Sequence, residues 1–168
     1  YHGKDGLLAG DVAGKLFAEM STVRPQTSKA LAEKVKAKGA ALIDCPVGGT
    51  VGPAKDGRLF GFVGGDAGDV ARARPLLDQL CRRVEHVGAV GAGATMKLAI
   101  NLPLLVYWQS LGEALSLCKP LGLEPARLMD IFADTSGAPN VLKVRGPALV
   151  AALGGAEISP ATFDIDSV

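Results

Sequence analysis

The sequence lacks most of the features that would assign a protein class at once. Aromatic residues make up only 5% of its 168 residues, and the formal net charge is +1, with the basic residues dispersed along the chain. A dispersed and balanced charge argues against nucleic-acid binding. The longest apolar run, residues 102–108, is far too short to cross a bilayer, so we expect no membrane partner.

Cysteine and histidine are also scarce. Cys45, Cys81 and Cys118 are widely spaced and odd in number, which predicts free thiols and a reducing, cytoplasmic compartment. His2 and His86 have no partner at metal-ligand spacing, and no C-x-x-C pair occurs, so we predict no metal site.

Three catalytic motifs are missing as well. The sequence contains no G-x-S-x-G nucleophile elbow, no P-loop and no G-x-G-x-x-G dinucleotide loop. It begins at Tyr1 rather than at a methionine, and a new segment starts where it ends at Val168. We therefore expect an internal fragment of a longer protein.

Strand-like runs alternate with helix signals in the first half of the chain. Pro25 and Thr27 open a helix that stops at Gly39, and Asp66 is placed to cap a second helix that contains Pro75. This alternation predicts an α/β layer arrangement. The strand-like runs are residues 15–20, 41–47, 58–65 and 82–88.

After residue 93 the pattern becomes helical throughout. A long apolar helix is predicted from about residue 92 to residue 118, and further helices are predicted within residues 124–136 and 138–153. The sequence thus predicts an α/β part followed by an all-α part, with a flexible Gly-Ala-Gly hinge at residues 91–93.

Two polar residues interrupt the apolar pattern just after these glycines, in the segment GAGATMKLAIN. Lys97 and Asn101 are four residues apart, so a helix places them on one face. A lysine that packs its stem and keeps its ammonium in water, beside a satisfied core amide, would produce the same pattern. A catalytic pair is the alternative.

A second candidate site is the glycine-rich segment DCPVGGTVGPAKDGRLFGFVGG, residues 44–65. It places Gly48 and Gly49 at the carboxyl end of a predicted strand, the edge at which ligands of open α/β sheets bind. Adjacent glycines let backbone N–H groups approach an anion such as a carboxylate. A tight turn without a ligand is the other interpretation.

Four segments together, in this order and spacing, resemble the β-hydroxyacid dehydrogenase family. EMSTVRPQTS is similar to the family's Ser-Thr-Val-x-Pro strand end, and DCPVGG to its substrate signature Asp-Ala-Pro-Val-Ser-Gly-Gly. GAGATMKLAIN resembles the catalytic signature, and FDIDSV the approach to a Lys-Asp-Leu motif. The family includes 3-hydroxyisobutyrate dehydrogenase and the tartronate semialdehyde and glyoxylate/succinic semialdehyde reductases.

The resemblance implies a fold and a domain division. Residues 1–90 would be the latter part of a Rossmann-type NAD(P)-binding domain, whose G-x-G-x-x-G half would precede Tyr1. Residues 91–168 would be the interdomain helix and the start of an all-α substrate and dimerisation domain. Homodimers or homotetramers through the helical domain are implied too.

The resemblance also implies an activity, the transfer of a hydride between NAD or NADP and a small β-hydroxyacid or aldehyde acid. The choice between the two cofactors depends on a residue outside this sequence. The implied site residues are Lys97 and Asn101 for catalysis, Gly48, Gly49 and Thr50 for the substrate carboxylate, and Ser21 and Thr22 for the cofactor.

Two departures from the family pattern bear on the substrate and on the helix. Gly48 stands where the family has Ser, and Thr50 stands where it has Gly, so the hydroxyl contact to the carboxylate is lost or comes from Thr50. Pro103 should kink the long helix. An imine reductase of the same fold and a non-catalytic cofactor-binding scaffold remain alternatives, and both are disfavoured by the presence of Lys97 and Asn101.

Overall fold

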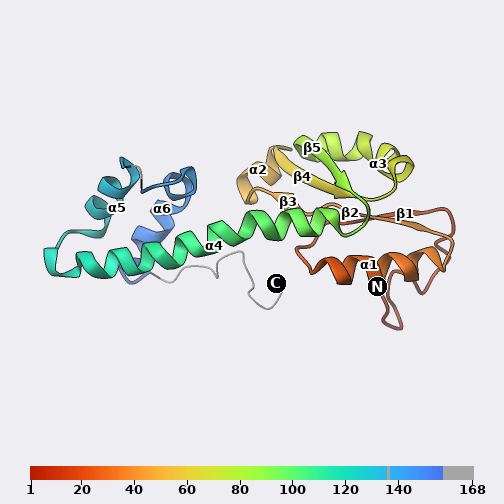
Figure 1. Cartoon of the computed structure of the whole chain (residues 1–168), viewed down its shortest axis with the longest axis horizontal. Helices are drawn as coiled ribbons and strands as arrows, with labels where there is room; N and C mark the ends of the chain where they lie inside the picture. The colour runs from red at the N-terminus through yellow and green to blue at the C-terminus, as the bar shows by residue number, and fades with distance from the viewer. Residues whose placement is uncertain (136, 157–168) are drawn as a thin grey trace. The chain divides into compact units, whose positions relative to one another are not determined.

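The computed structural model describes residues 1–135 and 137–156 (Figure 1). Contacts divide the chain into two compact units, and the division falls between Leu104 and Leu105, inside helix α4 (Ala92–Cys118). The domain boundary at residue 90 stays a prediction. The FDIDSV segment lies outside the described residues.

The first unit is built on a mixed five-stranded sheet with β4 at its centre. Strand β1 is parallel to β2, and β4 is parallel to β5, whereas β4 is antiparallel to both β2 and β3. The strands are β1 (Leu16–Glu19), β2 (Ala41–Asp44), β3 (Val47–Gly48), β4 (Leu59–Gly64) and β5 (Cys81–Gly88).

The run predicted as one strand over residues 41–47 is divided into β2 and β3. Pro46 lies in the gap and has no N–H group to donate to a strand ladder, although its carbonyl accepts a hydrogen bond from Phe62 N–H at 3.1 Å. The other three strand predictions agree with β1, β4 and β5 to within one or two residues.

Helices α1 (Pro25–Lys36) and α3 (Ala67–Leu80) pack on opposite faces of this sheet (Figure 1). Adjacent residues of β2 explain why, since Ile43 belongs to the core under α3 while Leu42 belongs to the core under α1. Both helices were predicted. The short helix α2 (Val51–Lys55) was not predicted.

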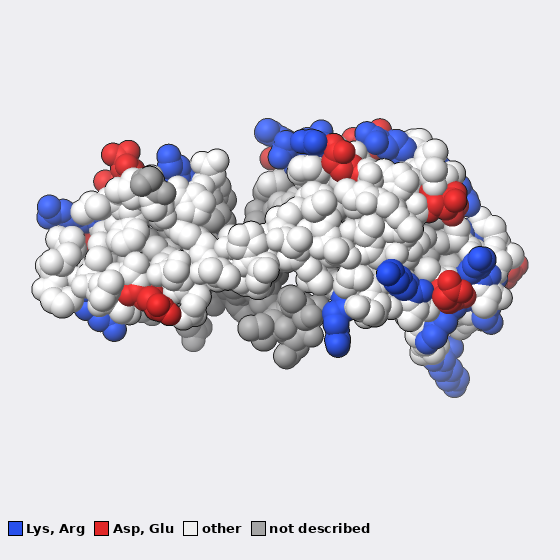
Figure 2. Space-filling model, in the orientation of Figure 1, with Lys and Arg blue, Asp and Glu red and all other residues white. Residues whose placement is uncertain are grey.

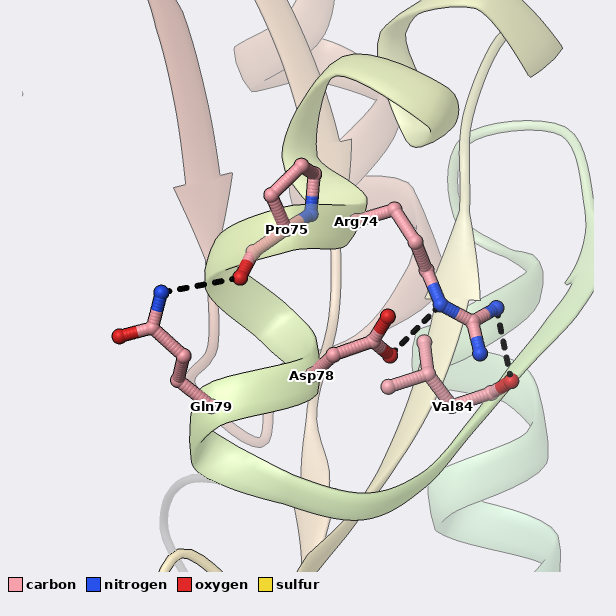
Figure 3. A network of polar contacts seen from close by, with 5 residues as sticks. All are labelled: Arg74, Pro75, Asp78, Gln79 and Val84. Carbon is pink, nitrogen blue, oxygen red and sulfur yellow. Dashed lines mark hydrogen bonds and ion pairs between the residues drawn. The ribbon is translucent and has the colours of Figure 1, made fainter.

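Helix α3 is tied to β5 by the polar network drawn in Figure 3. Arg74 Nε bonds to Asp78 Oδ1 at 2.7 Å, and the same guanidinium donates to the Val84 carbonyl at 3.4 Å. The helix continues through Pro75, whose carbonyl accepts a side-chain bond from Gln79 at 3.1 Å. The Arg74–Asp78 pair is half-exposed and therefore adds little stability.

The second unit is helical, as predicted. The latter part of α4 is followed by a 3₁₀ turn (Lys119–Leu121) and by α5 (Pro125–Ala133) and α6 (Asn140–Leu153). Leu111, Met129 and Leu142 form its buried core. Helix α4 begins at Ala92 and ends at Cys118, as predicted, and it is uninterrupted at Pro103.

Charged side chains and the length of the helices can be compared across the described residues. On the face shown in Figure 2, lysine and arginine side chains are interspersed with acidic ones. Across the described residues, no helix combines the length and the apolar character that a membrane span requires.

Candidate active site

The carboxylate of Asp44 connects the end of β2 to the start of α4. Asp44 is 1% exposed, and its Oδ1 accepts a hydrogen bond from Gly91 N–H at 2.7 Å. Its Oδ2 accepts a second bond from Ala94 N–H, also at 2.7 Å. N–H groups at a helix start have no partner within the helix, so Asp44 caps α4 from a distant strand.

Glycines let the backbone close around this carboxylate. A Cβ atom on Gly93 would overlap the Phe62 carbonyl oxygen and would lie 2.8 Å from the carbonyl oxygen of Asp44. A Cβ on Gly64 would overlap Asp44 Oδ1. The glycines at the start of α4 pack closely against β2 and β4, and the flexible hinge at residues 91–93 stays a prediction.

The Ser21–Thr22 segment meets the same junction through strand pairing. Glu19, the last residue of β1, is paired with Asp44, and Cys45 N–H donates to the Glu19 carbonyl at 2.7 Å. Ser21 N–H in turn donates to Glu19 Oε1 at 2.9 Å. Because parallel strands end at one edge of the sheet, the predicted cofactor segment lies beside Asp44.

Helix α1 begins at this edge as well. A Cβ on Gly91 would lie 3.2 Å from the carbonyl oxygen of Pro25, the first residue of α1, and 2.9 Å from Lys29 Cε. Gly91 has φ +93°, a conformation that other residues rarely adopt. The ends of β1 and β2 and the starts of α1 and α4 therefore converge on one point.

A cavity of about 600 Å³ opens beside Ser21, between the end of β1 and α1, and its volume suits a small-molecule site. Ser28 is 1% exposed, and its Oγ has no hydrogen-bond partner among the described residues. Burial and the neighbouring Glu19 raise the pKa of Tyr1 to about 12. The polar lining includes Tyr1, Glu19, Ser21, Arg24, Thr27 and Ser28.

Lys97 and Asn101 are buried on α4, although their apolar neighbours are not. Lys97 is 9% exposed and Asn101 is 2% exposed, whereas Met96, Ile100 and Leu102 are 39–64% exposed. The Asn101 Nδ2 group has no hydrogen-bond partner within the described part of the chain. The described chain therefore leaves one polar group of Asn101 unsatisfied, and the roles of both residues stay predictions.

The predicted substrate loop runs from β3 into α2. Gly49 has φ +124°, and a Cβ there would lie 2.9 Å from Leu59 Cδ2. Gly48 is less constrained, because a Cβ would make ordinary contact with the Phe62 ring at 3.6 Å. Thr50 is the N-cap residue of α2, but its hydroxyl makes no capping bond. That hydroxyl is therefore not used by the helix.

Sequence reasoning missed Asp44 as part of the site. Asp44 matches the first residue of the family's substrate signature, but that match gives no indication of a bond to residues 91–94. The adjacent Cys45 is not a candidate nucleophile, because burial, Cys81 and Asp44 raise the pKa of its thiol to about 12. The three cysteines are free thiols, as predicted.

Comparisons with known proteins identify the family. Residues 1–88 match the family described as the NAD binding domain of 6-phosphogluconate dehydrogenase. The 3-hydroxyisobutyrate dehydrogenase of Pseudomonas aeruginosa is 43% identical over 148 residues, which cover 88% of this chain and 49% of that protein. The chain therefore belongs to the β-hydroxyacid dehydrogenase family that carries this NAD-binding domain. It spans about half the length of the curated relatives that it matches.

Solved structures agree with this assignment. A structure described as Psf3 in complex with NADP+ and 2-OPP matches with a TM-score of 0.78 at 31% identity, covering 94% of this chain and 55% of that one. An imine reductase from Myxococcus stipitatus in complex with NADP+ matches with a TM-score of 0.70 at 17% identity, covering 93% of this chain and 55% of that one. The second likeness extends to the fold alone.

Proposed function

We propose that this chain supplies the latter part of the cofactor domain and the catalytic helix of an NAD(P)-dependent oxidoreductase. Its substrate would be a small β-hydroxyacid or the corresponding aldehyde acid, of the 3-hydroxyisobutyrate, tartronate semialdehyde, glyoxylate or succinic semialdehyde type. Residues 1–90 would belong to the cofactor domain, and residues 91–168 to the interdomain helix and the helical domain. One observation carries this proposal: Asp44, which lies four residues before the predicted substrate loop, accepts two hydrogen bonds from the start of the helix that bears Lys97.

Lys97 has the chemistry that carbonyl reduction needs. Negative charge grows on the carbonyl oxygen as hydride reaches the carbon, and an ammonium group stabilises that charge and delivers the proton. Its burial strengthens the interaction, since a charge acts more strongly away from water. The unpartnered Nδ2 group of Asn101 would donate to the substrate and orient it.

The predicted substrate contacts come from the loop after β3. The backbone N–H groups near Gly48 and Gly49 and the free hydroxyl of Thr50 would hold the carboxylate. This arrangement replaces the serine hydroxyl that the family has at position 48. An anion between this loop and Lys97 is the expected pose.

The nicotinamide cofactor, NAD or NADP, supplies the hydride when it is bound. The cavity beside Ser21 fits one end of such a ligand, because the buried Ser28 Oγ lacks a partner in the described structure. Ser21 and Thr22 would contact the cofactor there. The phosphate-binding loop would lie in a preceding segment of the whole protein, so this chain alone should not bind NADPH at micromolar concentration.

Lys97→Ala in the full-length protein tests the proposal. We expect kcat with small aldehyde acids to fall by about 10²–10⁴-fold, while the cofactor Kd changes little. Lys97→Arg should restore little of the kcat that Lys97→Ala loses, because a guanidinium is a very weak acid at neutral pH. Lys119→Ala, which removes an exposed lysine beyond the end of α4, is the matched control. Near-unchanged kcat in Lys97→Ala would refute the role of Lys97.

We propose that the whole protein is a cytoplasmic homodimer or homotetramer joined through its helical domain. Two large apolar side chains of α4 support an interface there, since Val106 is 59% exposed and Leu117 is 82% exposed. Light scattering during size-exclusion chromatography checks the state of the full-length protein, and a monomer would contradict it.

A further inference from the structure

We infer that Asp44 is a positioning residue for the proposed reaction. Its carboxylate fixes the first turn of α4, and so sets where Lys97 stands relative to the loop at Gly48. The inference rests on the proposed function, because the placement of Lys97 matters to the rate only if Lys97 takes part in the reaction.

The two hydrogen bonds of Asp44 restrain both the position and the rotation of α4. Its two oxygens bind N–H groups of Gly91 and Ala94, which are three residues apart on the helix start. A single bond would leave the helix free to pivot about it, whereas two bonds from one carboxylate do not. Lys97 follows Ala94 by three residues, which is about 4.5 Å along the helix axis.

The same residue also fixes the other side of the site. Asp44 is the last residue of β2 and is paired with Gly64 of β4. The chain reaches Gly48 only four residues later, after the buried Pro46. The side chain of Asp44 thus connects the strand that leads to the predicted substrate loop with the helix that carries Lys97.

The chemistry of the contact requires a carboxylate. A buried carboxylate needs hydrogen-bond donors, and the two N–H groups at a helix start supply them together with a favourable helix dipole. An asparagine has the same shape but only one acceptor atom, so its NH₂ group would face either Gly91 N–H or Ala94 N–H. Asp44→Asn therefore breaks one of the two bonds without changing the volume of the side chain.

The test compares Asp44→Asn with Asp66→Asn in the full-length protein. Asp66 also caps a helix, accepting from Gly68 N–H at 2.9 Å, but its bond is exposed and serves only α3. Both variants should lower the melting temperature. Only Asp44→Asn should lower kcat, by about 10–100-fold, because a displacement of about 1 Å at a reacting group has effects of this size. The KM for the cofactor should stay within about two-fold.

A milder variant keeps the test decisive if Asp44→Asn does not fold. Thr95→Val removes the hydroxyl that donates to the Gly91 carbonyl at 2.8 Å, in the same helical turn. We expect kcat to fall about three-fold or more with the cofactor KM unchanged. If Asp44→Asn folds and has the same kcat as Asp66→Asn, the inference is overturned. If Asp44→Asn does not fold, a Thr95→Val variant with the same kcat as Asp66→Asn overturns it instead. If Lys97→Ala also retains kcat, the proposed function fails instead.

Discussion

An aspartate side chain accepts hydrogen bonds from the first turn of both α3 and α4, but the two aspartates occupy different positions in the chain. Asp66 directly precedes α3, is exposed, and accepts one bond from Gly68 two residues later. Asp44 is buried and reaches α4 from a strand that ends 47 residues before Gly91. The first cap stabilises its own helix, whereas the second also joins two parts of the candidate site.

This difference has a physical consequence. An exposed local cap contributes typically about 1 kcal/mol and can open without disturbing the rest of the molecule. A buried carboxylate that loses its donors leaves an unpaired charge, which is far less tolerable. The α4 junction should therefore stay closed unless the surrounding sheet opens, while the α3 cap should open freely.

The largest expected effect is on the reactivity of Cys45, which lies next to Asp44. Its thiol pKa is raised from 9.0 to about 12, so the folded chain holds about 10³-fold less thiolate near pH 8. Alkylation by N-ethylmaleimide should be slower by at least this factor in the native chain than in urea, as followed by mass spectrometry. The half-buried Cys118 provides the internal control, and equal labelling of both thiols would show that the junction opens.

The same shift predicts how stability depends on pH. The unfolded thiol of Cys45 ionises near its ordinary pKa of 9.0, but the folded thiol ionises only near 12. The unfolded state therefore binds fewer protons in this window, so the thiol contributes stability below pH 9 that is lost as the pH rises toward 12. A flat urea midpoint between pH 9 and pH 11 would contradict this assignment.

The next effect is on stability, and it compares two glycines of α4. Gly93→Ala would place Cβ against the Phe62 carbonyl oxygen and the Asp44 backbone, so we expect the free energy of unfolding to fall by about 3 kcal/mol. Gly112 has no atom within 4 Å of its Cβ position, and Gly112→Ala should raise stability by about 0.5–1 kcal/mol. Urea unfolding measures both changes. Equal changes in the free energy of unfolding of the two variants would contradict close packing at the start of α4.

The smallest effect separates the two adjacent glycines of the substrate loop. Gly49→Ser should destabilise the chain by about 1–2 kcal/mol, because Gly49 has φ +124° and faces Leu59. Gly48→Ser should change stability by less than about 0.5 kcal/mol, because its Cβ position has room. In the full-length protein, Gly48→Ser should also lower KM for a carboxylate substrate, and a raised KM would argue against a hydroxyl contact there.

Much of the fold could be predicted because its signals are local. The cap at Asp66, the start of α1 at Pro25 and the long helix after residue 91 each depend on residues within a few positions. The antiparallel pairing of β4 with β2 and the break at Pro46 depend instead on contacts between distant segments. Such contacts leave no regular pattern in a single sequence.

The candidate site was predicted only in part for the same reason. Lys97 and Asn101 stood out because they are polar residues in an apolar helix. Their burial beside exposed apolar neighbours was not predicted, since hydrophobic periodicity assigns the apolar face to the core. The roles of these two residues and of Gly48, Gly49, Thr50, Ser21 and Thr22 remain predictions.

Amide hydrogen exchange, measured by NMR on this chain, tests most directly whether Asp44 fixes the start of α4. We predict that the Gly91 and Ala94 amides exchange as slowly as the Phe62 amide in the centre of the sheet, because their acceptor is buried. The Gly68 amide, bonded to the exposed Asp66, should exchange at least about 100-fold faster. Exchange of Gly91 and Ala94 at the rate of Gly68 would mean that residues 91–94 are a flexible hinge and that Asp44 does not position Lys97.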